Sequence, residues 1–367
     1  MNLYSPRFTC GFSAYLVCGL AMAATEAPKV QVYNWYDYIG PTTLADFQRD
    51  TGIQPVYDTY DSGEVLEAKL LTGRSGYDVV VASNFILPGL IKAGAIQKLD
   101  RSQLPNLPHL DPVLLEKLRA NDPDNLYAVP YLWGTDGLGY NVDKVKAALG
   151  NDAPVNSWDL LFKEDNIAKL SDCGVALLDA PAEIIPIALH YLGLPPNSSN
   201  PADYKQAEAL LLKVRPYIRY CDSPKIQADL SNGDICLAVA WSGTVLSAQQ
   251  AARDAGKGVH VEYSIPAEGA PLWIDNLVQV KDSQHPAQGL SFINYMLRPE
   301  VIAPATDLAM TANANKDATT LVSADVRNSQ DLYPSAETMA TLFILQPQPH
   351  AIERIRTRAW SKIKNGR

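Results

Sequence analysis

The chain has few of the residues from which metal sites and thiol chemistry are built. Its 367 residues include five cysteines and five histidines, no Cys-x-x-Cys pair occurs, and the histidines are scattered along the chain. Zinc sites need several such ligands, commonly in closely spaced pairs. We therefore expect neither a metal site nor a cofactor.

Motifs typical of phosphate-binding and nucleophilic enzymes are also missing. There is no P-loop, no G-x-G-x-x-G after a strand and no G-x-S-x-G, and the serines, histidines and aspartates show no triad spacing. An exported hydrolase would need a nucleophile and a base that the sequence does not offer. We therefore expect the protein not to be an enzyme.

Basic residues are in the minority, with 31 Lys and Arg against 40 Asp and Glu and a formal net charge of −9. Nucleic-acid binding requires a basic face, so a cationic partner is the better match. The basic tail at 354–367 interleaves its charges with Ile355, Trp360 and Ile363, which is typical of a solvated helix face. We expect no nucleic-acid partner.

Beyond the N-terminus, no apolar run reaches the ~18 residues of a membrane-spanning helix. The first residues carry Arg7, an apolar segment at about 10–20 and then Ala21-Met22-Ala23, the layout of a secretory signal with an A-x-A cleavage site. We predict a signal peptide at 1–23, cleavage after Ala23, and a periplasmic protein without membrane insertion. Export leaves Cys173, Cys221 and Cys236 in an oxidising compartment, where two of the three can pair.

Apolar strands alternate with amphipathic helices, the pattern of an α/β fold, and the length favours about two domains. Asp78–Val81 predicts a buried strand, 86–93 a helix ended by Gly94, and the Pro-, Asn- and Ser-rich stretch 194–203 a surface loop.

Aromatic and polar residues gather where predicted strands end or begin. The strands end in Tyr33-Asn34-Trp35-Tyr36-Asp37-Tyr38, in Ser83-Asn84 and in Trp241-Ser242-Gly243, with Thr244 opening the next helix, and a further strand begins at Trp273-Ile274-Asp275. Strand ends form the ligand crevice of a doubly wound sheet. Aromatic faces beside a carboxylate form a favourable site for a desolvated cation. Each contact between the cation and a ring stabilises binding by about 0.5–2 kcal/mol. The alternative is plain core packing, with Asp37 capping the following helix.

Motifs along nearly the whole mature chain resemble the periplasmic polyamine-binding proteins of ABC transporters, the putrescine/spermidine group. They are Val32-Tyr33-Asn34-Trp35 with Asp37-Tyr38-Ile39, Tyr77-Asp78-Val79-Val80, Asp122-Pro123-Asp124-Asn125, Gly139-Tyr140-Asn141-Val142, Asn232-Gly233-Asp234-Ile235-Cys236, Ala312-Asn313-Ala314-Asn315 and Thr357-Arg358-Ala359-Trp360. The resemblance implies an α/β, two-lobed periplasmic binding protein of type II, with two doubly wound domains joined by a two-strand hinge. The crossovers are expected near 133–138 and 263–266. The implied lobes are 24–134 with 266–316, and 135–265 with 317–367.

The resemblance also assigns residues to a ligand site and a disulfide. It implies an aromatic box around an alkyl chain, a main ammonium anchor at Asp275 and assisting polar groups at Asp37, Ser83 and Glu183. The box consists of Trp35, Tyr38, Trp241 and Trp273. A Cys173–Cys236 disulfide is implied, with Cys221 free.

Several positions differ from the family pattern. Tyr36 stands where the family has Ser or Thr, Thr244 replaces an Asp that would hold the second amine of putrescine, and Thr311 replaces a Tyr. Trp273 is similar to spermidine binders, since the putrescine type carries Phe there. We therefore expect Tyr36 to reduce the pocket volume and Thr244 to weaken putrescine binding.

The expected function is capture of a polyamine or related aliphatic amine by a monomeric solute-binding protein that serves an ABC permease. Because one anchor is replaced, a monoammonium ligand such as an ω-amino acid (4-aminobutyrate-like) is an alternative. A ligand-sensing partner of a membrane receptor is another alternative.

Overall fold

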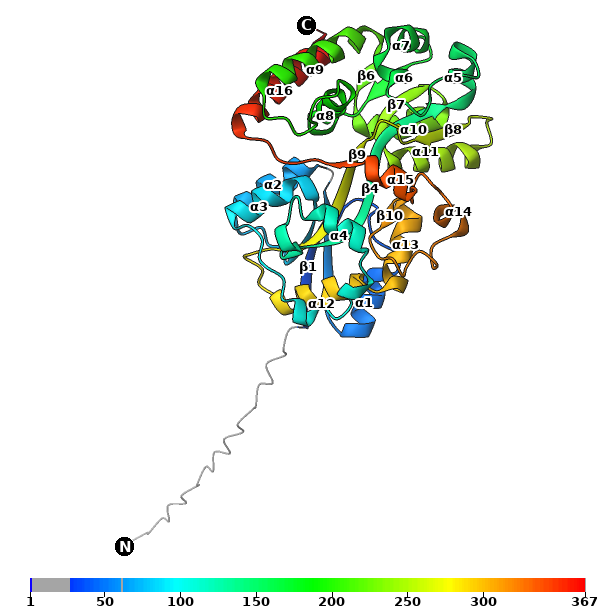
Figure 1. Cartoon of the computed structure of the whole chain (residues 1–367). Coiled ribbons are helices and arrows are strands. Elements are labelled where there is room, and N and C mark those ends of the chain that lie inside the picture. Colours follow the sequence, from blue (N-terminus) through cyan, green and yellow to red (C-terminus); the bar gives the residue numbers. More distant parts are fainter. Residues whose placement is uncertain (2–26, 61, 367) are drawn as a thin grey trace.

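The computed structural model describes Met1, residues 27–60 and residues 62–366. The predicted signal peptide, apart from Met1, and its cleavage site lie outside the described residues. Figure 1 shows two α/β bodies that meet where long strands run from one to the other. No helix in the described part of the chain is long and apolar enough to cross a membrane.

The strands follow one path in the order β2-β1-β3-β9-β4-β7-β5-β6. Parallel pairs β1–β2 and β1–β3 form one half and parallel pairs β5–β7 and β5–β6 the other, while β9 and β4 are antiparallel to their neighbours on this path. The strands are β1 Lys29–Trp35, β2 Gln54–Tyr60, β3 Val79–Ser83, β4 Ala128–Asn141, β5 Val175–Leu177, β6 Tyr220–Cys221, β7 Leu237–Trp241, β8 Val261–Ser264, β9 Pro271–Gln279, β10 Ala312–Asn313 and β11 Phe343–Ile344. Two parallel-stranded halves confirm the predicted α/β architecture.

Strand β4 changes partner in its middle and so joins the two halves. Gly134 and Thr135 pair with β9, whereas Asp136 and the residues after it pair with β7. The second link is the segment 265–270 between β8 and β9. These links lie near the predicted crossovers, and the lobe boundaries stay predictions.

Helices pack against the strands of both bodies (Figure 1). Their bounds are α1 Thr43–Thr51, α2 Gly63–Leu71, α3 Leu87–Ala93, α4 Pro112–Leu118, α5 Val142–Leu149, α6 Asp159–Phe162, α7 Glu164–Leu170, α8 Pro181–Tyr191, α9 Pro201–Val214, α10 Ser223–Asn232, α11 Ser242–Ala255, α12 Pro286–Met296, α13 Pro299–Ala309, α14 Ala324–Arg327, α15 Ala336–Thr341 and α16 His350–Asn365.

Two helix starts differ from the predictions. Helix α9 begins at Pro201, inside the predicted loop 194–203, because the side chain of Asn200 accepts from Ala202 N at 3.1 Å and proline suits the first helical turn. Helix α11 begins at Ser242, two residues before Thr244. The predicted end of α3 is confirmed, since Gly94 adopts a left-handed φ of 67°.

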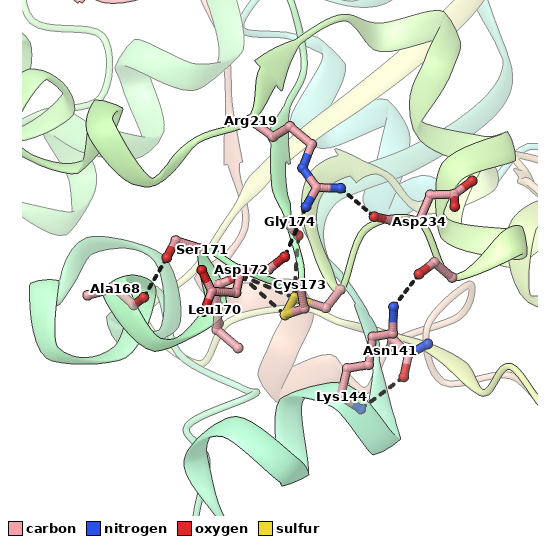
Figure 2. The surroundings of a disulfide bond; sticks show 12 residues. Asn141, Lys144, Ala168, Leu170, Ser171, Asp172, Cys173, Gly174, Arg219 and Asp234 are labelled. Atoms are coloured by element: carbon pink, nitrogen blue, oxygen red, sulfur yellow. Dashed lines mark hydrogen bonds between the residues drawn. A yellow bond between two sulfur atoms is a disulfide. The ribbon is translucent and has the colours of Figure 1, made fainter.

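The predicted disulfide is confirmed. Cys173 and Cys236 are bonded with their Cα atoms 5.5 Å apart, and the bridge joins residues 63 positions apart (Figure 2). Arg219 donates to the carbonyls of Asp172 at 3.1 Å and Asp234 at 2.6 Å beside the bridge. A loop of this length corresponds to about 4 kcal/mol in the chain-entropy model.

Cys221 forms no disulfide. Burial raises the pKa of its thiol to about 11, so the reactive thiolate is scarce at neutral pH. Cys221 therefore behaves as a small, partly buried packing residue.

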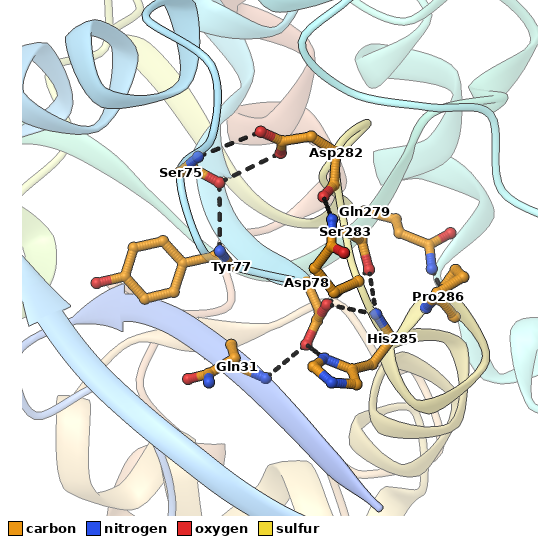
Figure 3. A network of polar contacts seen from close by, with 10 residues as sticks. Gln31, Ser75, Tyr77, Asp78, Gln279, Asp282, Ser283, His285 and Pro286 are labelled. Atoms are coloured by element: carbon orange, nitrogen blue, oxygen red, sulfur yellow. Dashed lines mark hydrogen bonds and ion pairs between the residues drawn. The ribbon is translucent and has the colours of Figure 1, made fainter.

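A buried polar network fastens the start of β3 (Figure 3). Asp78 is 1% exposed, and its carboxylate accepts from Gln31 N at 2.8 Å, Ser283 Oγ at 2.6 Å, and both the backbone N at 2.9 Å and Nδ1 at 3.0 Å of His285. Four donors satisfy the carboxylate, as a buried acid requires. The network ties β1 and β3 to the loop before α12.

Candidate functional site

Asp275 is a buried carboxylate on β9. It is 5% exposed, and it accepts from Ser83 Oγ at 2.5 Å and from the Tyr38 hydroxyl at 2.9 Å. Ser83 reaches it because β3 and β9 place these two residues directly opposite each other. Tyr38 comes from the loop after β1.

Burial of Asp275 disfavours its ionised form, but neighbouring polar groups partly offset this effect. Burial raises the pKa of Asp275 from 3.8 to about 6, while the hydroxyls of Ser83 and Tyr38 and the indole of Trp35 lower it. At neutral pH the carboxylate is therefore mostly ionised inside the protein. A cation beside it would gain a strong, poorly screened attraction.

Aromatic rings surround this carboxylate. Trp35 ends β1, packs on Tyr60 with ring centroids 4.3 Å apart, and has its indole toward Asp275. Trp273 lies two residues before Asp275 on β9 and is 8% exposed. The neighbouring Ile274 N donates to the side chain of Asn84 at 2.9 Å, which fixes β9 at this point.

A second acid lies beside a third tryptophan. Glu183, in the first turn of α8, is 6% exposed, and Trp241 Nε1 donates to its two carboxylate oxygens at 3.1 and 3.2 Å. The partial positive charge of a helix N-terminus stabilises a carboxylate there. Trp241 ends β7, as predicted from the sequence.

Asp136 is a third buried acid, and sequence reasoning missed it. It is fully buried, and neither oxygen of its carboxylate has a hydrogen-bond partner. Burial, and then the nearby Glu183, raise its pKa well above the ordinary value. One charged residue within the otherwise uncharged, fully buried strand β4 was the sequence feature that could have found it, since burying an unpaired acid is costly.

The strand register connects these groups. Gly134 pairs with Trp273 and Asp136 pairs with Trp241, and residues two apart on a strand share a face. A Cβ atom on Gly134 would collide with the ring of Trp273, which confirms that the ring covers this face. Trp273, Asp136, Trp241 and Glu183 therefore belong to one arrangement, continuous with Asp275.

We call this arrangement the junction cluster; its members are Trp35, Tyr38, Ser83, Asp136, Glu183, Trp241, Trp273 and Asp275. Within the described residues, seven buried side-chain polar atoms lack a hydrogen bond of standard geometry, and four of them belong to Trp35, Asp136 and Trp273; the Trp35 indole lies near enough to Asp275 to lower its pKa but does not form such a bond. Because folded proteins normally pair such atoms, their concentration in one place is typical of a ligand site. The described part of the chain contains no group of three or more His, Cys, Asp or Glu side chains that could hold a metal ion.

Tyr36 and Asp37 lie outside the cluster. Tyr36 is 73% exposed, so its side chain lies on the surface of this structure, and its effect on the pocket volume stays a prediction. Asp37 is exposed with a φ of 52°, and α1 begins later, after Thr42, so Asp37 is not its cap.

The two threonine substitutions lie close together beside the junction. Thr244 is in the first turn of α11 and is partly buried. Thr311 is 2% exposed and donates to Ala309 O at 2.9 Å. A Cβ atom on Gly243 would touch Thr311 Oγ1, so the start of α11 packs directly against the segment before β10.

Two α/β bodies that are joined by a shared long strand and carry a buried acidic and aromatic cluster beside the junction define a two-lobed periplasmic binding protein of type II. The chain belongs to the bacterial extracellular solute-binding protein family, whose model matches residues 42–332. The predicted fold class and periplasmic location are thereby confirmed.

Named relatives are similar over nearly their whole length. The chain is 56% identical over 363 residues to the putrescine/agmatine-binding protein of Pseudomonas aeruginosa, covering 95% of this chain and 99% of the relative. It is 49% identical over 359 residues to a putrescine-binding periplasmic protein of Escherichia coli, covering 96% and 97%. A solved structure of a spermidine/putrescine ABC transporter substrate-binding protein from Streptococcus pneumoniae matches with a TM-score of 0.80 at 26% identity, covering 93% and 99%.

Proposed function

We propose that the protein captures a polyamine, with putrescine as the simplest candidate, and delivers it to an ABC permease. The observation that carries this proposal is the buried carboxylate of Asp275, oriented by Ser83 and Tyr38 beside tryptophan rings. The names of the relatives at 49% and 56% identity support it.

The roles of the residues follow from their chemistry. Asp275 receives an ammonium group, and Ser83 and Tyr38 hold that carboxylate in position. The rings of Trp35, Tyr38, Trp241 and Trp273 enclose the alkyl chain, exclude water and attract the cation. Glu183 assists at the far end, and Asp37 and Thr311 contribute at the edge.

No reaction occurs on the ligand, and the protein acts as a monomer that presents the loaded state to the permease. The proposed lobes, 24–134 with 266–316 and 135–265 with 317–367, rotate about β4 and the segment 265–270 and enclose the ligand. Closure of this kind sequesters a ligand at a hinge without changing either lobe.

The ω-amino acid alternative is not favoured. The carboxylate of such a ligand would lie among the buried acids Asp136 and Glu183, where a further negative charge is disfavoured. The relatives are also named for amines. Because a similar solved structure is named for an ABC transporter, we propose import and not sensing.

Isothermal titration of the exported protein with putrescine, spermidine and 4-aminobutyrate tests the proposal. We expect an amine to bind in the micromolar range or tighter, corresponding to about −8 kcal/mol, and 4-aminobutyrate to bind at least about 100-fold more weakly. Absence of binding to all amines, with the protein folded, would contradict it.

A further inference from the structure

The position of Asp136 is unusual for a structural residue. It lies in the middle of β4, where the strand passes from one half of the molecule to the other, and it is fully buried with both carboxylate oxygens unpartnered. Burying an unpaired acid opposes folding, so a residue of this kind needs a compensating partner at some stage of its function.

The register gives the distance between Asp136 and Asp275. Asp136 is two residues beyond Gly134, and Asp275 is two residues beyond Trp273, in the opposite direction because the strands are antiparallel. Four steps along the strands and one step across to the neighbouring strand place their Cα atoms about 14 Å apart. Trp273 lies between them on the same face.

A short diamine matches this span. Extended putrescine has its nitrogens about 6 Å apart at standard bond lengths. A charge-assisted hydrogen bond of about 2.8 Å at each end brings the distance between two accepting carboxylate oxygens to about 12 Å. An amine bound at Asp275 and lying along Trp273 would therefore bring its other end to Asp136.

We propose that Asp136, together with Glu183, is the anchor for the second cationic group of the ligand, at the end opposite Asp275. This inference rests on the proposed function and narrows it to linear ligands of about four carbons with a cation at each end. The family pattern expects an acid at position 244 for this role. In this chain the role falls instead to Asp136, on the strand β4 that joins the two halves. Thr244 offers only a neutral hydroxyl and is not needed as an anchor.

The groups around Asp136 suit a cation. Glu183 faces it from α8, and Tyr263 faces it from β8. The Glu183 oxygens accept from the Trp241 indole, whereas both Asp136 oxygens are available. Burial and the nearby Glu183 raise the pKa of Asp136, which favours its neutral form when no cation is bound. A bound ammonium allows both acids to ionise, so binding of a dication should release a proton to solvent.

The test compares putrescine with 1-butylamine, which has the same chain and one ammonium. Calorimetric titrations use the wild type, Asp136→Asn and the matched control Asp331→Asn. Asp331 is another acid whose pKa burial raises to about 6, but its acidic neighbour is Glu262. Thermal unfolding without ligand verifies that each variant is folded.

We expect Asp136→Asn to weaken putrescine binding by about 30-fold or more, while 1-butylamine binding changes by less than about threefold. Asp331→Asn should change neither. Equal losses for both ligands, or a change for putrescine of less than about threefold, would overturn the assignment. If wild type binds neither amine, the proposed function fails; if it binds putrescine and Asp136→Asn does too, only this inference fails.

A measurement on the wild type covers the case in which Asp136→Asn does not fold. Titration at pH 7 in two buffers of different ionisation enthalpy reports the protons released on binding. Putrescine should release more protons than 1-butylamine, because only putrescine places a cation at Asp136. Equal proton release by the two ligands would overturn the inference.

Discussion

Two buried aspartates, one at the start of β3 and one at the junction of the two halves, have contrasting surroundings. Asp78, at the start of β3, is 1% exposed and accepts four hydrogen bonds (Figure 3). Asp136, at the junction, is fully buried and accepts none. Burial alone therefore does not distinguish a structural acid from a functional one, whereas the pairing of its oxygens does.

Asp275 lies between these extremes. Its two oxygens accept from Ser83 and Tyr38, yet burial still raises its pKa to about 6. The carboxylate is positioned by hydrogen bonds, and within the described residues no cation of the protein is recorded beside it. A structural acid uses all of its hydrogen-bonding capacity within the folded protein, whereas a binding acid keeps part of this capacity for the ligand.

The largest expected effect is on ligand affinity at Asp275. Asp275→Ala should weaken binding of any amine by about 2–5 kcal/mol, or roughly 30-fold to several thousand-fold, because the buried ammonium loses its carboxylate. Calorimetry measures this, with Asp331→Asn as control. Binding within about threefold of wild type would place the ammonium elsewhere.

The stability of the ligand-free protein should depend on pH, because a buried, ionised Asp275 opposes folding. Its pKa is raised from 3.8 to about 6, so between these values the folded protein binds more protons than the unfolded chain. The stability of the ligand-free protein should therefore fall by about 3 kcal/mol as pH rises through this window, relative to Asp275→Asn. Urea unfolding of both proteins at pH 4 and pH 7 measures the difference. A difference that is independent of pH would refute the raised pKa.

Amine affinity should show the opposite trend and increase as pH rises through 6.

Neutralising Asp78 and Asp136 should change stability differently. Asp78→Asn should lower the free energy of unfolding by about 1–3 kcal/mol, because an amide cannot accept from all four donors. Asp136→Asn should not lower it, since it removes a potential charge that has no partner. Chemical unfolding of the ligand-free proteins at pH 7 measures both. Equal destabilisation would mean that Asp136 is also a structural acid.

A substitution at position 244 tests whether the second ammonium of putrescine, at the end opposite Asp275, already has a carboxylate to bind. Thr244→Asp should change putrescine affinity of the wild type by less than about threefold, but should raise that of Asp136→Asn by about tenfold through a new charge-assisted hydrogen bond. Titration calorimetry on the single and double variants measures both effects. A tenfold gain in the wild type would show that the second amine otherwise has no carboxylate.

The smallest effect is expected at Tyr36. Tyr36→Ser should change affinity and stability by less than about 0.5 kcal/mol, because the side chain is 73% exposed and lies outside the junction cluster. A larger change in putrescine affinity would indicate that Tyr36 moves inward when the ligand binds.

Much of the fold could be predicted from local sequence. The apolar run before Ser83, the helix ended by Gly94 and the cysteines at 173 and 236 correspond to β3, α3 and the disulfide. The resemblance to polyamine-binding proteins supplied the partner of each cysteine and the residues assigned to the site.

Other features depend on partners far apart in the chain. The pairing of Asp78 with Ser283 and His285 spans more than 200 residues, so its structural role could not be predicted locally. The outward direction of Tyr36 depends on how the end of β1 packs. Asp136 was visible as a lone acid in an apolar strand, but only the fold places it beside Glu183 and Trp241.

A crystal structure of the protein with putrescine tests the central claim most directly. We predict one ammonium within about 3 Å of the Asp275 carboxylate, the chain along Trp273, and the other ammonium within about 3 Å of Asp136 or Glu183. Putrescine bound away from Asp275 would contradict the proposed site. A second ammonium pointing to Thr244 or solvent, with Asp136 still unpartnered, would contradict the assigned second anchor.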